Sequence, residues 1–462
     1  MRDMERRDVK IAYIGGGSRG WAWQLMGDLA REPALGGEVR LYDIDQEAAR
    51  CNEVIGNRLS ALPEAAGRWR YTAQETLGGA LEGADFVIIS ILPGTFDEME
   101  SDVHAPEAYG VLQPVGDTTG PGGMLRALRT GPMYAQFARA IAAHCPQAWV
   151  INYTNPMAQC VRTLYEVFPG IRAFGCCHEV FSTQKLLADA LMEQGCENLT
   201  RHDLRTTVAG VNHFTWVTDA RYRDIDVMPI YRAFVEKYAQ SGYGLPEEGN
   251  WLNRFFLCGH RVKFDLFQRY GAIAAAGDRH LAEFNPAPRY LRSREEVQAW
   301  QFSLTPVSWR KQELGERRAR AQRLYSGAEQ PIMKASDEEG VLQMKALLGM
   351  GDMVTNVNLP NRGQIANAPL GAVVETNAAF SGGSLQPVHA GALPAPILAL
   401  SMPALAAQEQ LAAAIAARDA TLAFPAFAND PLLVSLTQAQ ARTLYSDMLR
   451  ATAAYLPGWK LA

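Results

Sequence analysis

Hydrophobic and polar positions in the first 180 residues follow the pattern of strands and helices in alternation. Val9 to Ile14 is a short apolar run, Trp21 to Arg31 is amphipathic with the period of a helix, and Glu38 to Asp43 is a second strand that ends in an acid. Three further apolar runs, each typical of a buried parallel strand, span residues 84–92, 149–153 and 173–176. This order predicts an α/β chain that begins with a Rossmann domain.

A glycine-rich turn lies between the first strand and the first helix. Residues 15–20 (GGGSRG) have the G-x-G-x-x-G spacing, in which backbone N–H groups approach a pyrophosphate at the helix N-terminus. Asp43 is placed to accept hydrogen bonds from the ribose hydroxyls of NAD. A glycine-rich loop without a nucleotide is the alternative, which the flanking strands and the acid disfavour. The predicted NAD contacts are Gly15, Gly16, Gly17, Ser18, Asp43 and Pro93, the last in the loop after the strand at 84–92.

The pattern changes beyond about residue 190. Longer helical stretches then mix with strands such as Thr206 to Val211, and an alanine-rich helix is expected from Ala404 to about Arg418. We therefore predict an NAD-binding Rossmann domain at 1–195 and a C-terminal α+β domain at 196–462 for substrate binding and oligomerisation. This arrangement resembles that of the lactate and malate dehydrogenases.

Composition and charge favour a protein that binds a small molecule. The chain has 462 residues, 48% hydrophobic and 20% charged, with a formal net charge of -5. That charge provides no basic surface for nucleic acid or an anionic membrane, and no window approaches the roughly 20 apolar residues of a membrane span. The charged first ten residues lead directly into a strand and the seven cysteines are scattered, so we expect reduced thiols and a cytoplasmic location.

Chemically active side chains follow three of the predicted strands. Asn155 follows the strand at 149–153, Cys177 and His178 follow the strand at 173–176, and His213 follows the strand at 206–211. A cysteine thiolate and a neutral histidine are good ligands for a divalent transition metal. On spacing alone, however, a buried cysteine that packs as a small hydrophobic residue and a hydrogen-bonded histidine remain open as the alternative.

The order of these motifs resembles that of glycoside hydrolase family 4. The resemblance rests on GGGS at 15–18, GDTTGPGG at 116–123, NYTNP at 152–156, CH at 177–178 and GVNH at 210–213, and it covers nearly the whole chain. Within that family the runs ISILPGTFDEMESDVH and AFGCCHEVF are most similar to the alpha-galacturonidase branch. The family resemblance implies a glycosidase that uses NAD and Mn²⁺.

The resemblance also implies roles for individual residues. Cys177 and His213 would bind Mn²⁺, and Asn155 would hold sugar hydroxyls. His178 matches the proton donor, and a histidine there argues for an unphosphorylated substrate. We expect Asp278 to be the base, with Tyr270 second. Asp117 matches an acid that raises the basicity of the base.

The mechanism implied by the resemblance removes an otherwise inert proton. NAD⁺ accepts a hydride from carbon 3 of the sugar, which acidifies the hydrogen on carbon 2 so that the base can remove it. The glycosidic oxygen then leaves, water adds and the hydride returns. A uronate substrate would need a bidentate arginine, for which Arg126 and Arg279 are the candidates. Arg129 matches an arginine found broadly in the family and is not diagnostic.

The predicted function is hydrolysis of an alpha-linked uronide, with a galacturonide as the expected substrate. The alternatives are the same mechanism on a neutral alpha-glucoside or alpha-galactoside, an NAD-dependent 2-hydroxy acid dehydrogenase, and an NAD-responsive binding protein without activity. A small-molecule glycoside is the expected partner, and the resemblance suggests a homodimer or homotetramer.

Overall fold

One mixed sheet runs through the molecule in the computed structural model, which describes residues 6–245 and 255–461. Its strand order is β10-β8-β7-β12-β11-β6-β5-β4-β1-β2-β3, with β9 paired to β8 and β13 to β12. The parallel strands are β1 (Arg7–Ile14), β2 (Leu35–Tyr42), β3 (Arg68–Ala73), β4 (Phe86–Ile89), β5 (Trp149–Asn152) and β6 (Arg172–Gly175). Their order, 3-2-1-4-5-6, confirms the predicted Rossmann fold.

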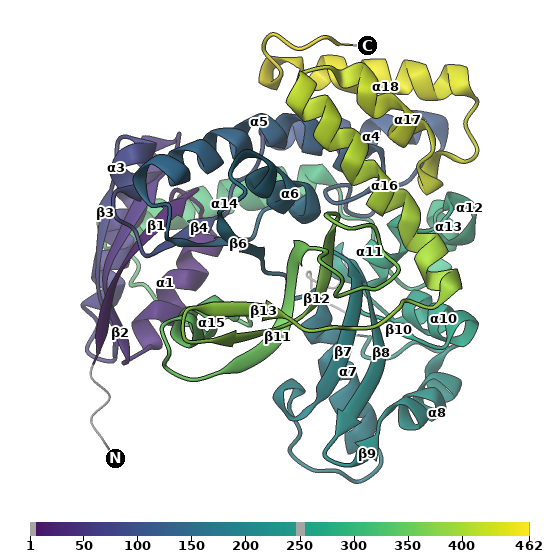
Figure 1. The fold of residues 1–462 in the computed structure, drawn as a ribbon, viewed down its shortest axis with the longest axis horizontal. Coiled ribbons are helices and arrows are strands. Elements are labelled where there is room, and N and C mark those ends of the chain that lie inside the picture. Colours follow the sequence, from purple (N-terminus) through teal and green to yellow (C-terminus); the bar gives the residue numbers. More distant parts are fainter. Residues whose placement is uncertain (1–5, 246–254, 462) are drawn as a thin grey trace.

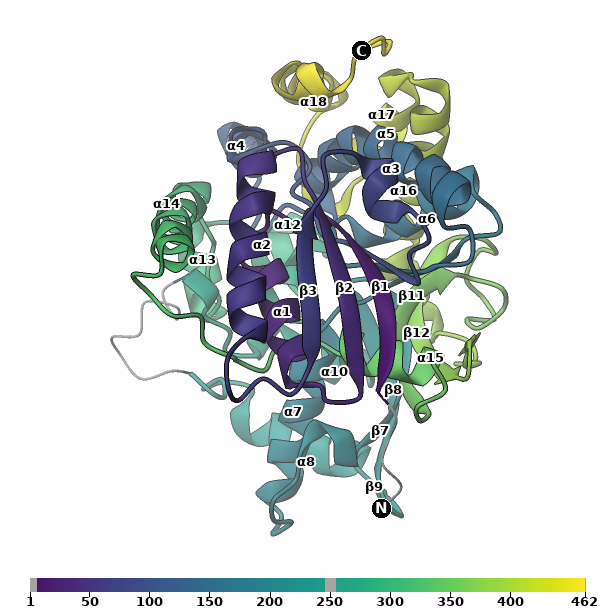
Figure 2. The same ribbon diagram turned by 90° about the vertical axis from the view of Figure 1, so that its left-hand side faces the viewer.

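Helices cover both faces of the parallel strands (Figures 1 and 2). Ile11 and Tyr13 of β1 pack in one core with α1, whereas Ala12 and Ile14 point to the opposite face and pack with α5. This alternation follows from the two-residue period of a strand. The helices of this part are α1 (Trp21–Arg31), α2 (Gln46–Ser60), α3 (Leu77–Leu81), α4 (Phe96–His104), α5 (Gly120–His144), α6 (Met157–Val167) and α7 (Glu179–Met192).

The remaining strands extend the sheet in antiparallel fashion. β11 joins the parallel part at a single pair, Asn358 opposite Gly175 of β6. The C-terminal strands are β7 (Arg205–Val211), β8 (Phe214–Tyr222), β9 (Ile225–Asp226), β10 (Ile273–Ala274), β11 (Met353–Pro360), β12 (Val373–Ser381) and β13 (Ser384–Pro387). Antiparallel strands with separate helices confirm the α+β prediction, while the boundary between residues 195 and 196 stays a prediction because the sheet is continuous.

The C-terminal helices pack against the antiparallel strands and against α5. The first half of α5, including Leu125 and Leu128, shares a core with α16, whereas its second half, including Tyr134 and Ile141, belongs to the Rossmann core. Helix α5 therefore joins both parts of the molecule. The helices are α8 (Met228–Tyr238), α10 (Arg261–Tyr270), α11 (Asp278–Glu283), α12 (Ala287–Tyr290), α13 (Arg294–Ala299), α14 (Val307–Ser326), α15 (Gly340–Leu347), α16 (Ala395–Ala417), α17 (Phe424–Ala428) and α18 (Gln438–Thr452).

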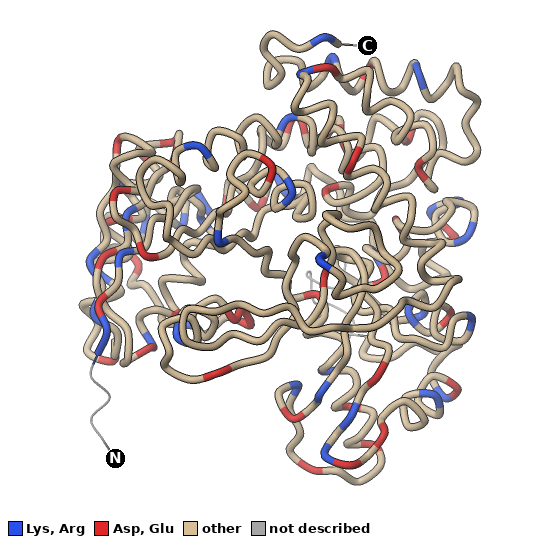
Figure 3. The backbone as a smooth tube through the Cα atoms, in the orientation of Figure 1, with Lys and Arg blue, Asp and Glu red and all other residues tan. Residues whose placement is uncertain are grey.

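The surface charge is mixed, as the composition predicted. Figure 3 shows basic and acidic residues interspersed along the chain without a large region of one sign. Among the helices of the described residues, none combines the length and the apolar character needed to cross a membrane.

The turn after β1 requires glycine at position 15. Gly15 has a φ of +93°, and a Cβ there would lie 2.0 Å from the backbone oxygen of Ser90. Gly83 also has a positive φ, +60°, but a Cβ there would meet no atom within 4 Å. An alanine at position 15 would therefore meet both backbone strain and a steric clash, whereas an alanine at position 83 would meet backbone strain alone.

Gly15→Ala should lower the free energy of unfolding by roughly 3 kcal/mol, because strain and overpacking add at this position. Gly83→Ala should cost about 1 kcal/mol, the strain alone. Urea unfolding of both variants measures the difference. Equal losses would contradict the close approach of the turn to Ser90.

Candidate active site

The loops after three strands meet beyond the carboxyl ends of the parallel sheet. β5 is followed by Asn155, β6 by Cys177 and His178, and the turn between β7 and β8 carries His213. Cys177 and His213 are buried, with 6% and 4% of their surfaces exposed. Asp117 approaches from the loop that precedes α5, and its hydroxyl neighbour Thr118 bonds to His213. The structure thus brings together most of the chemically active residues that the sequence singled out.

A chain of hydrogen bonds fixes the protonation of His213. The Thr118 hydroxyl lies 2.7 Å from Asp117 Oδ1, to which it donates, and 2.8 Å from His213 Nδ1. A hydroxyl has one hydrogen, so it must accept from Nδ1–H while it donates to the carboxylate. The lone pair of His213 is therefore on Nε2. Burial and the neighbouring His280 lower the pKa of His213 to about 3, which keeps the imidazole neutral and able to bind a metal.

Carboxylates surround Cys177. Burial, followed by the charges of Glu375 and Glu179, raises the pKa of the Cys177 thiol well above its ordinary value. Glu375 is held by Thr215 Oγ1 at 2.8 Å and by Asn356 Nδ2 at 2.6 Å, and Asn356 Nδ2 also donates to the Cys177 carbonyl. A thiolate in this place needs a nearby positive charge, and a divalent cation between Cys177 and His213 would supply it.

Sequence reasoning missed His280 and Glu179, which adjoin the predicted metal ligands. The His280 and His213 rings lie 4.0 Å apart, and His280 Nε2 is 3.4 Å from Glu179 Oε1. His280 Nδ1 is buried without a hydrogen-bond partner among the described residues. Burial opposes the charge of Glu179, but its pKa is held well below its usual range, with His280 as the strongest opposing influence and the protonated His178 in support. An ionised Glu179 places the proton of His280 on Nε2 and leaves Nδ1 free to accept one.

His178 is more exposed than its neighbours and is paired with an acid. Its Nδ1 lies 2.7 Å from Glu338 Oε1, and 45% of its side chain is accessible. Although burial opposes the charged form, the contact with Glu338 raises the pKa of His178 to about 9, so the imidazole is protonated at neutral pH. Glu338 belongs to the acidic run 337–339, which matches no known sequence motif. Its contact with His178 becomes apparent only in the folded structure.

Neither predicted base, Asp278 or Tyr270, points toward Cys177 and His213. The Asp278 carboxylate accepts from the N–H groups of Val262 and Lys263, at 3.2 and 3.1 Å, and so caps α10. Burial, with a smaller contribution from Cys258, raises its pKa to about 7. The Tyr270 hydroxyl lies 3.5 Å from Arg289 Nη1, and its ring meets Trp216 edge-on. Neither side chain bonds to Cys177 or His213 in the part of the chain that the structure describes.

The Asp278 side chain instead belongs to a second cluster. Its carboxylate, Cys258 and His260 offer ligand atoms within 4.8 Å of one another, a donor set that can hold a metal ion. The buried Lys263 side chain donates to Thr183 Oγ1 at 2.7 Å; burial lowers its pKa, and the charges of Cys258 and Asp278 oppose that shift. This cluster is distinct from the Cys177 and His213 pair.

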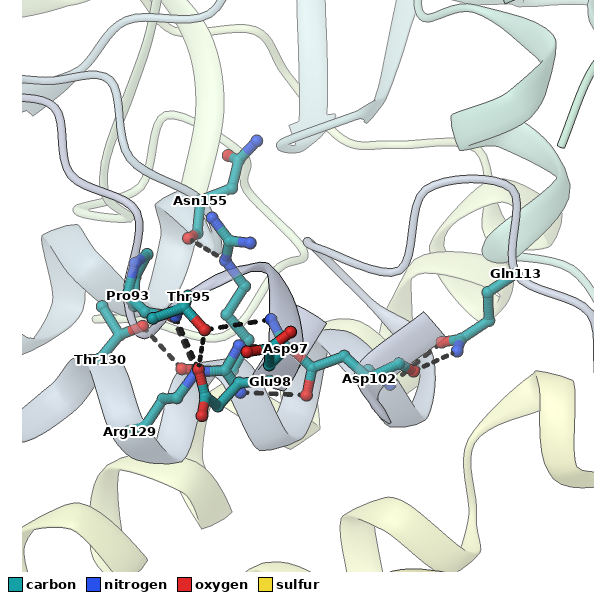
Figure 4. A network of polar contacts seen from close by, with 11 residues as sticks. Pro93, Thr95, Asp97, Glu98, Asp102, Gln113, Arg129, Thr130 and Asn155 are labelled. Carbon is teal, nitrogen blue, oxygen red and sulfur yellow. Dashed lines mark hydrogen bonds and ion pairs between the residues drawn. The ribbon is translucent and has the colours of Figure 1, made fainter. Parts of the chain in front are cut away.

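The three arginines considered from the sequence have different surroundings. Arg129 is fully buried and forms an ion pair with Asp102, and its Nε donates to the Pro93 carbonyl at 2.9 Å (Figure 4). Arg126 Nε donates to the Asn155 carbonyl at 3.0 Å, and Arg279 Nη1 donates to Thr305 Oγ1 at 2.5 Å. Arg129 is therefore structural, and its contact fixes the loop at Pro93.

The predicted nucleotide loop is held by hydrogen bonds within the loop and by hydrogen bonds to Asp43. Ser18 N donates to the Gly15 carbonyl at 3.0 Å, and Gly17 N donates to Asp43 Oδ2 at 2.9 Å. Asp45 N donates to the other oxygen of the Asp43 carboxylate at 2.9 Å. The glycine turn and the acid thus meet as a Rossmann nucleotide site requires.

Comparison with known proteins gives the family of this chain. The model of the family 4 glycosyl hydrolases matches residues 10–193, and that of the family 4 glycosyl hydrolase C-terminal domain matches residues 208–433. The chain belongs to glycosyl hydrolase family 4. The resemblance seen in its motifs is thereby confirmed.

Relatives of high identity extend along the whole chain. An alpha-galacturonidase of Thermoanaerobacterium saccharolyticum is 58% identical and aligns over 99% of each chain. The crystal structure of the putative glucosidase lplD from Bacillus subtilis superposes with a TM-score of 0.91 at 52% identity, covering 96% of this chain and 100% of that one. A 6-phospho-alpha-glucosidase from gut microorganisms, solved with NAD and Mn²⁺, shares the fold with a TM-score of 0.79 at 20% identity, over 98% of this chain and 100% of that one.

Arg129→Met should lower the free energy of unfolding by about 3 kcal/mol, because it leaves the Asp102 carboxylate buried without a partner. Arg292→Met is the control, since Arg292 pairs with Glu296 at the surface with 69% of its side chain exposed. It should change stability by less than about 1 kcal/mol. Chemical unfolding that gives both variants the same stability would contradict the structural role of Arg129.

Proposed function

We propose that this protein hydrolyses an alpha-linked galacturonide with the help of NAD and a divalent cation, Mn²⁺ in the first place. The observation that carries the proposal is the convergence of a buried thiol, a neutral imidazole with its Nε2 free and a nucleotide loop at one edge of the sheet. The 58% identity to an alpha-galacturonidase supports the choice of sugar. The cytoplasmic location and the homodimer or homotetramer stay predictions.

The residues present fit both cofactors. Cys177 Sγ and His213 Nε2 would bind the cation, and Asn155, whose buried Oδ1 has no partner among the described residues, would hold sugar hydroxyls. Gly15, Gly16, Gly17, Ser18 and Asp43 would hold the nucleotide, with Pro93 beside it. When bound, NAD⁺ would supply the oxidant for a hydroxyl group of the sugar, and the cation would act as a Lewis acid on the sugar oxygens.

His280 is the base that the geometry favours over Asp278 and Tyr270. Its Nδ1 is buried and free to accept a proton, Glu179 lies at Nε2, and its ring contacts that of His213. Burial opposes the charge of Asp117, yet its pKa is held low, with Arg126 as the strongest opposing charge and a hydrogen bond from Thr118, so this carboxylate stays charged beside the base. A charged Asp117 stabilises the imidazolium that forms when His280 takes the proton from carbon 2.

His178 supplies the proton to the leaving glycosidic oxygen. It follows Cys177 directly, it is partly exposed where an aglycone must leave, and Glu338 keeps it protonated. After departure of the aglycone, the same imidazole, now neutral, accepts a proton from the water that adds to carbon 1.

The test of the function is release of para-nitrophenol from the alpha-galacturonide, the alpha-galactoside and the alpha-glucoside. Each is incubated with NAD⁺, Mn²⁺ and thiol, and with each additive omitted in turn. Release from the uronide that requires NAD⁺ and Mn²⁺ supports the proposal. Release only from a neutral sugar overturns the choice of substrate, and net NADH formation without release would favour a dehydrogenase.

His280→Gln should reduce kcat on the uronide by about 10²- to 10⁴-fold, the usual contribution of a general base. Binding of Mn²⁺ and NAD⁺ should be retained, since Cys177 and His213 remain. Asp278→Asn is the comparison, because its side chain caps α10. A larger loss in Asp278→Asn, with both proteins folded and loaded, would return the role of base to Asp278.

Glu338→Gln should reduce hydrolysis of a galacturonide with an alkyl aglycone by about 100-fold, as expected for a weakened general acid. Release of para-nitrophenolate, which leaves without a proton, should change only a few-fold. The ratio of the two rates is the measurement. Equal losses on both substrates would show that Glu338 acts only on structure.

A further inference from the structure

Helix α14 packs beside α4 and α2 (Figure 2). Its start is fixed by two contacts: Thr305 N donates to the Pro114 carbonyl at 3.2 Å, and Val307 N donates to His104 Nε2 at 3.2 Å. Pro114 lies three residues before Asp117. The first turn of α14, which carries Arg310, is therefore held against the loop that carries Asp117.

Arg310 is without a hydrogen-bond or ion-pair partner among the described residues. Its guanidinium forms no hydrogen bond or ion pair with any residue that the structure describes. Burial lowers the pKa of Arg310 to about 10; the charge of Asp117 acts against this, and the charges of Arg279 and Arg126 add to it. A half-buried cation among other cations is costly unless an anion joins it.

Arg126 offers a second unused donor to the same region. Only 5% of its surface is exposed, and its Nε donates to the Asn155 carbonyl. Its Nη1 is buried and has no hydrogen-bond partner within residues 6–245 and 255–461. Of the cations around Asp117, Arg126 interacts with its carboxylate most strongly. The free N–H group of Arg126 thus lies beside Asn155 and Asp117, where the sugar is expected.

The guanidinium group of Arg279, in contrast, already has hydrogen-bond partners in the protein. Its Nη1 donates to the Phe255 carbonyl at 3.0 Å and to Thr305 Oγ1, and its guanidinium lies 4.7 Å from the centre of the Phe256 ring. These contacts hold the loop before α14. The prediction that Arg279 binds substrate therefore has less support than that for Arg126.

We propose that Arg310 and Arg126 together form a carboxylate-binding site that selects uronides over neutral sugars. The proposal rests on the proposed glycosidase function and names the group of the substrate that this site binds. Asp117 is the one acid among the main charges that act on Arg310, whereas Arg126 also has Asp102 and Arg279 also has Glu179 and Glu283. Asp117 is shared with Arg126 and Arg279, so Arg310 keeps positive charge without an acid of its own. A planar carboxylate accepts paired N–H groups from guanidinium donors and restores the balance.

The nucleotide phosphates are the other anion that Arg310 could meet, and its position argues against them. Arg317 lies two helical turns further along α14, and a Cβ added at Gly20 would be 2.6 Å from its Nη1. Arg317 therefore faces the end of the nucleotide loop. Arg310 lies toward Asp117, on the side of the sugar.

The test compares Arg310→Met with Arg318→Met, a change at an exposed arginine of the same helix. In Arg310→Met, kcat/KM on para-nitrophenyl alpha-galacturonide should fall roughly 100-fold, as expected from loss of a charge-assisted contact. Any activity on the alpha-galactoside and the affinity for NAD⁺ should be unchanged, and Arg318→Met should match the parent enzyme. Equal losses of kcat/KM on both sugars, or no loss on either, would overturn the proposal. Weaker NAD⁺ binding would show that Arg310 contacts the nucleotide phosphates instead.

A binding measurement separates this proposal from the function on which it rests. Calorimetry with galacturonate and galactose, each in the presence of NAD⁺ and Mn²⁺, needs no turnover. Tighter binding of galacturonate that disappears in Arg310→Met supports the carboxylate site even if the parent enzyme cleaves no uronide. Turnover of the uronide with the same galacturonate affinity in both proteins supports the function and refutes the site.

Discussion

The hydrogen-bond chain from Asp117 through Thr118 to His213 is the contact on which the candidate active site depends. It connects the loop before α5 with the turn between β7 and β8, and so joins the Rossmann part to the antiparallel part. His213 has a left-handed backbone, with a φ of +64°, which an L-residue adopts only when its surroundings hold it there. The chain sets the tautomer of His213 and keeps the negative charge of Asp117 close to it.

The balance of charge around this chain explains the remaining polar residues. Glu179 and Glu375 lie near Cys177, and the pKa of Glu375 is raised to about 7 chiefly by burial. On the side of Arg126 and Arg310, the positive charge of the guanidinium groups is not fully matched by hydrogen-bond or ion-pair partners among the described residues. A divalent cation on the first side and a substrate carboxylate on the second would each remove an unfavourable arrangement. Under the proposed function, the metal would bind on the first side and the uronate carboxylate on the second.

The sequence was sufficient to predict the Rossmann domain and the side chains that lie at the ends of its strands. The apolar runs that end before Asn155 and Cys177 correspond to β5 and β6, and parallel strands present their carboxyl ends at one edge, so convergence followed from topology. The strand β3 was not predicted, because it is polar at alternate positions and has no continuous apolar run. The pairing of β11 with β6 was not predicted, because β11 lies 178 or more residues after β6.

Side-chain direction was the part that the sequence could not supply. Asp278 and His280 are two residues apart at the start of α11, yet the first turns to α10 and the second to His213. No local pattern distinguishes these directions, since they follow from how α11 packs. Glu338 and Arg310 reach the site from distant segments whose placement depends on tertiary packing, and neither carries a motif.

The central claim is that the chain removes the proton on carbon 2 of the sugar before the glycosidic bond breaks. The most direct measurement is hydrolysis of the galacturonide in D₂O with NAD⁺ and Mn²⁺, followed by proton NMR of the released galacturonate. The account predicts deuterium at carbon 2 of the product and retention of the original hydrogen at carbon 3. Product without deuterium at carbon 2 would contradict it and would require direct displacement at carbon 1.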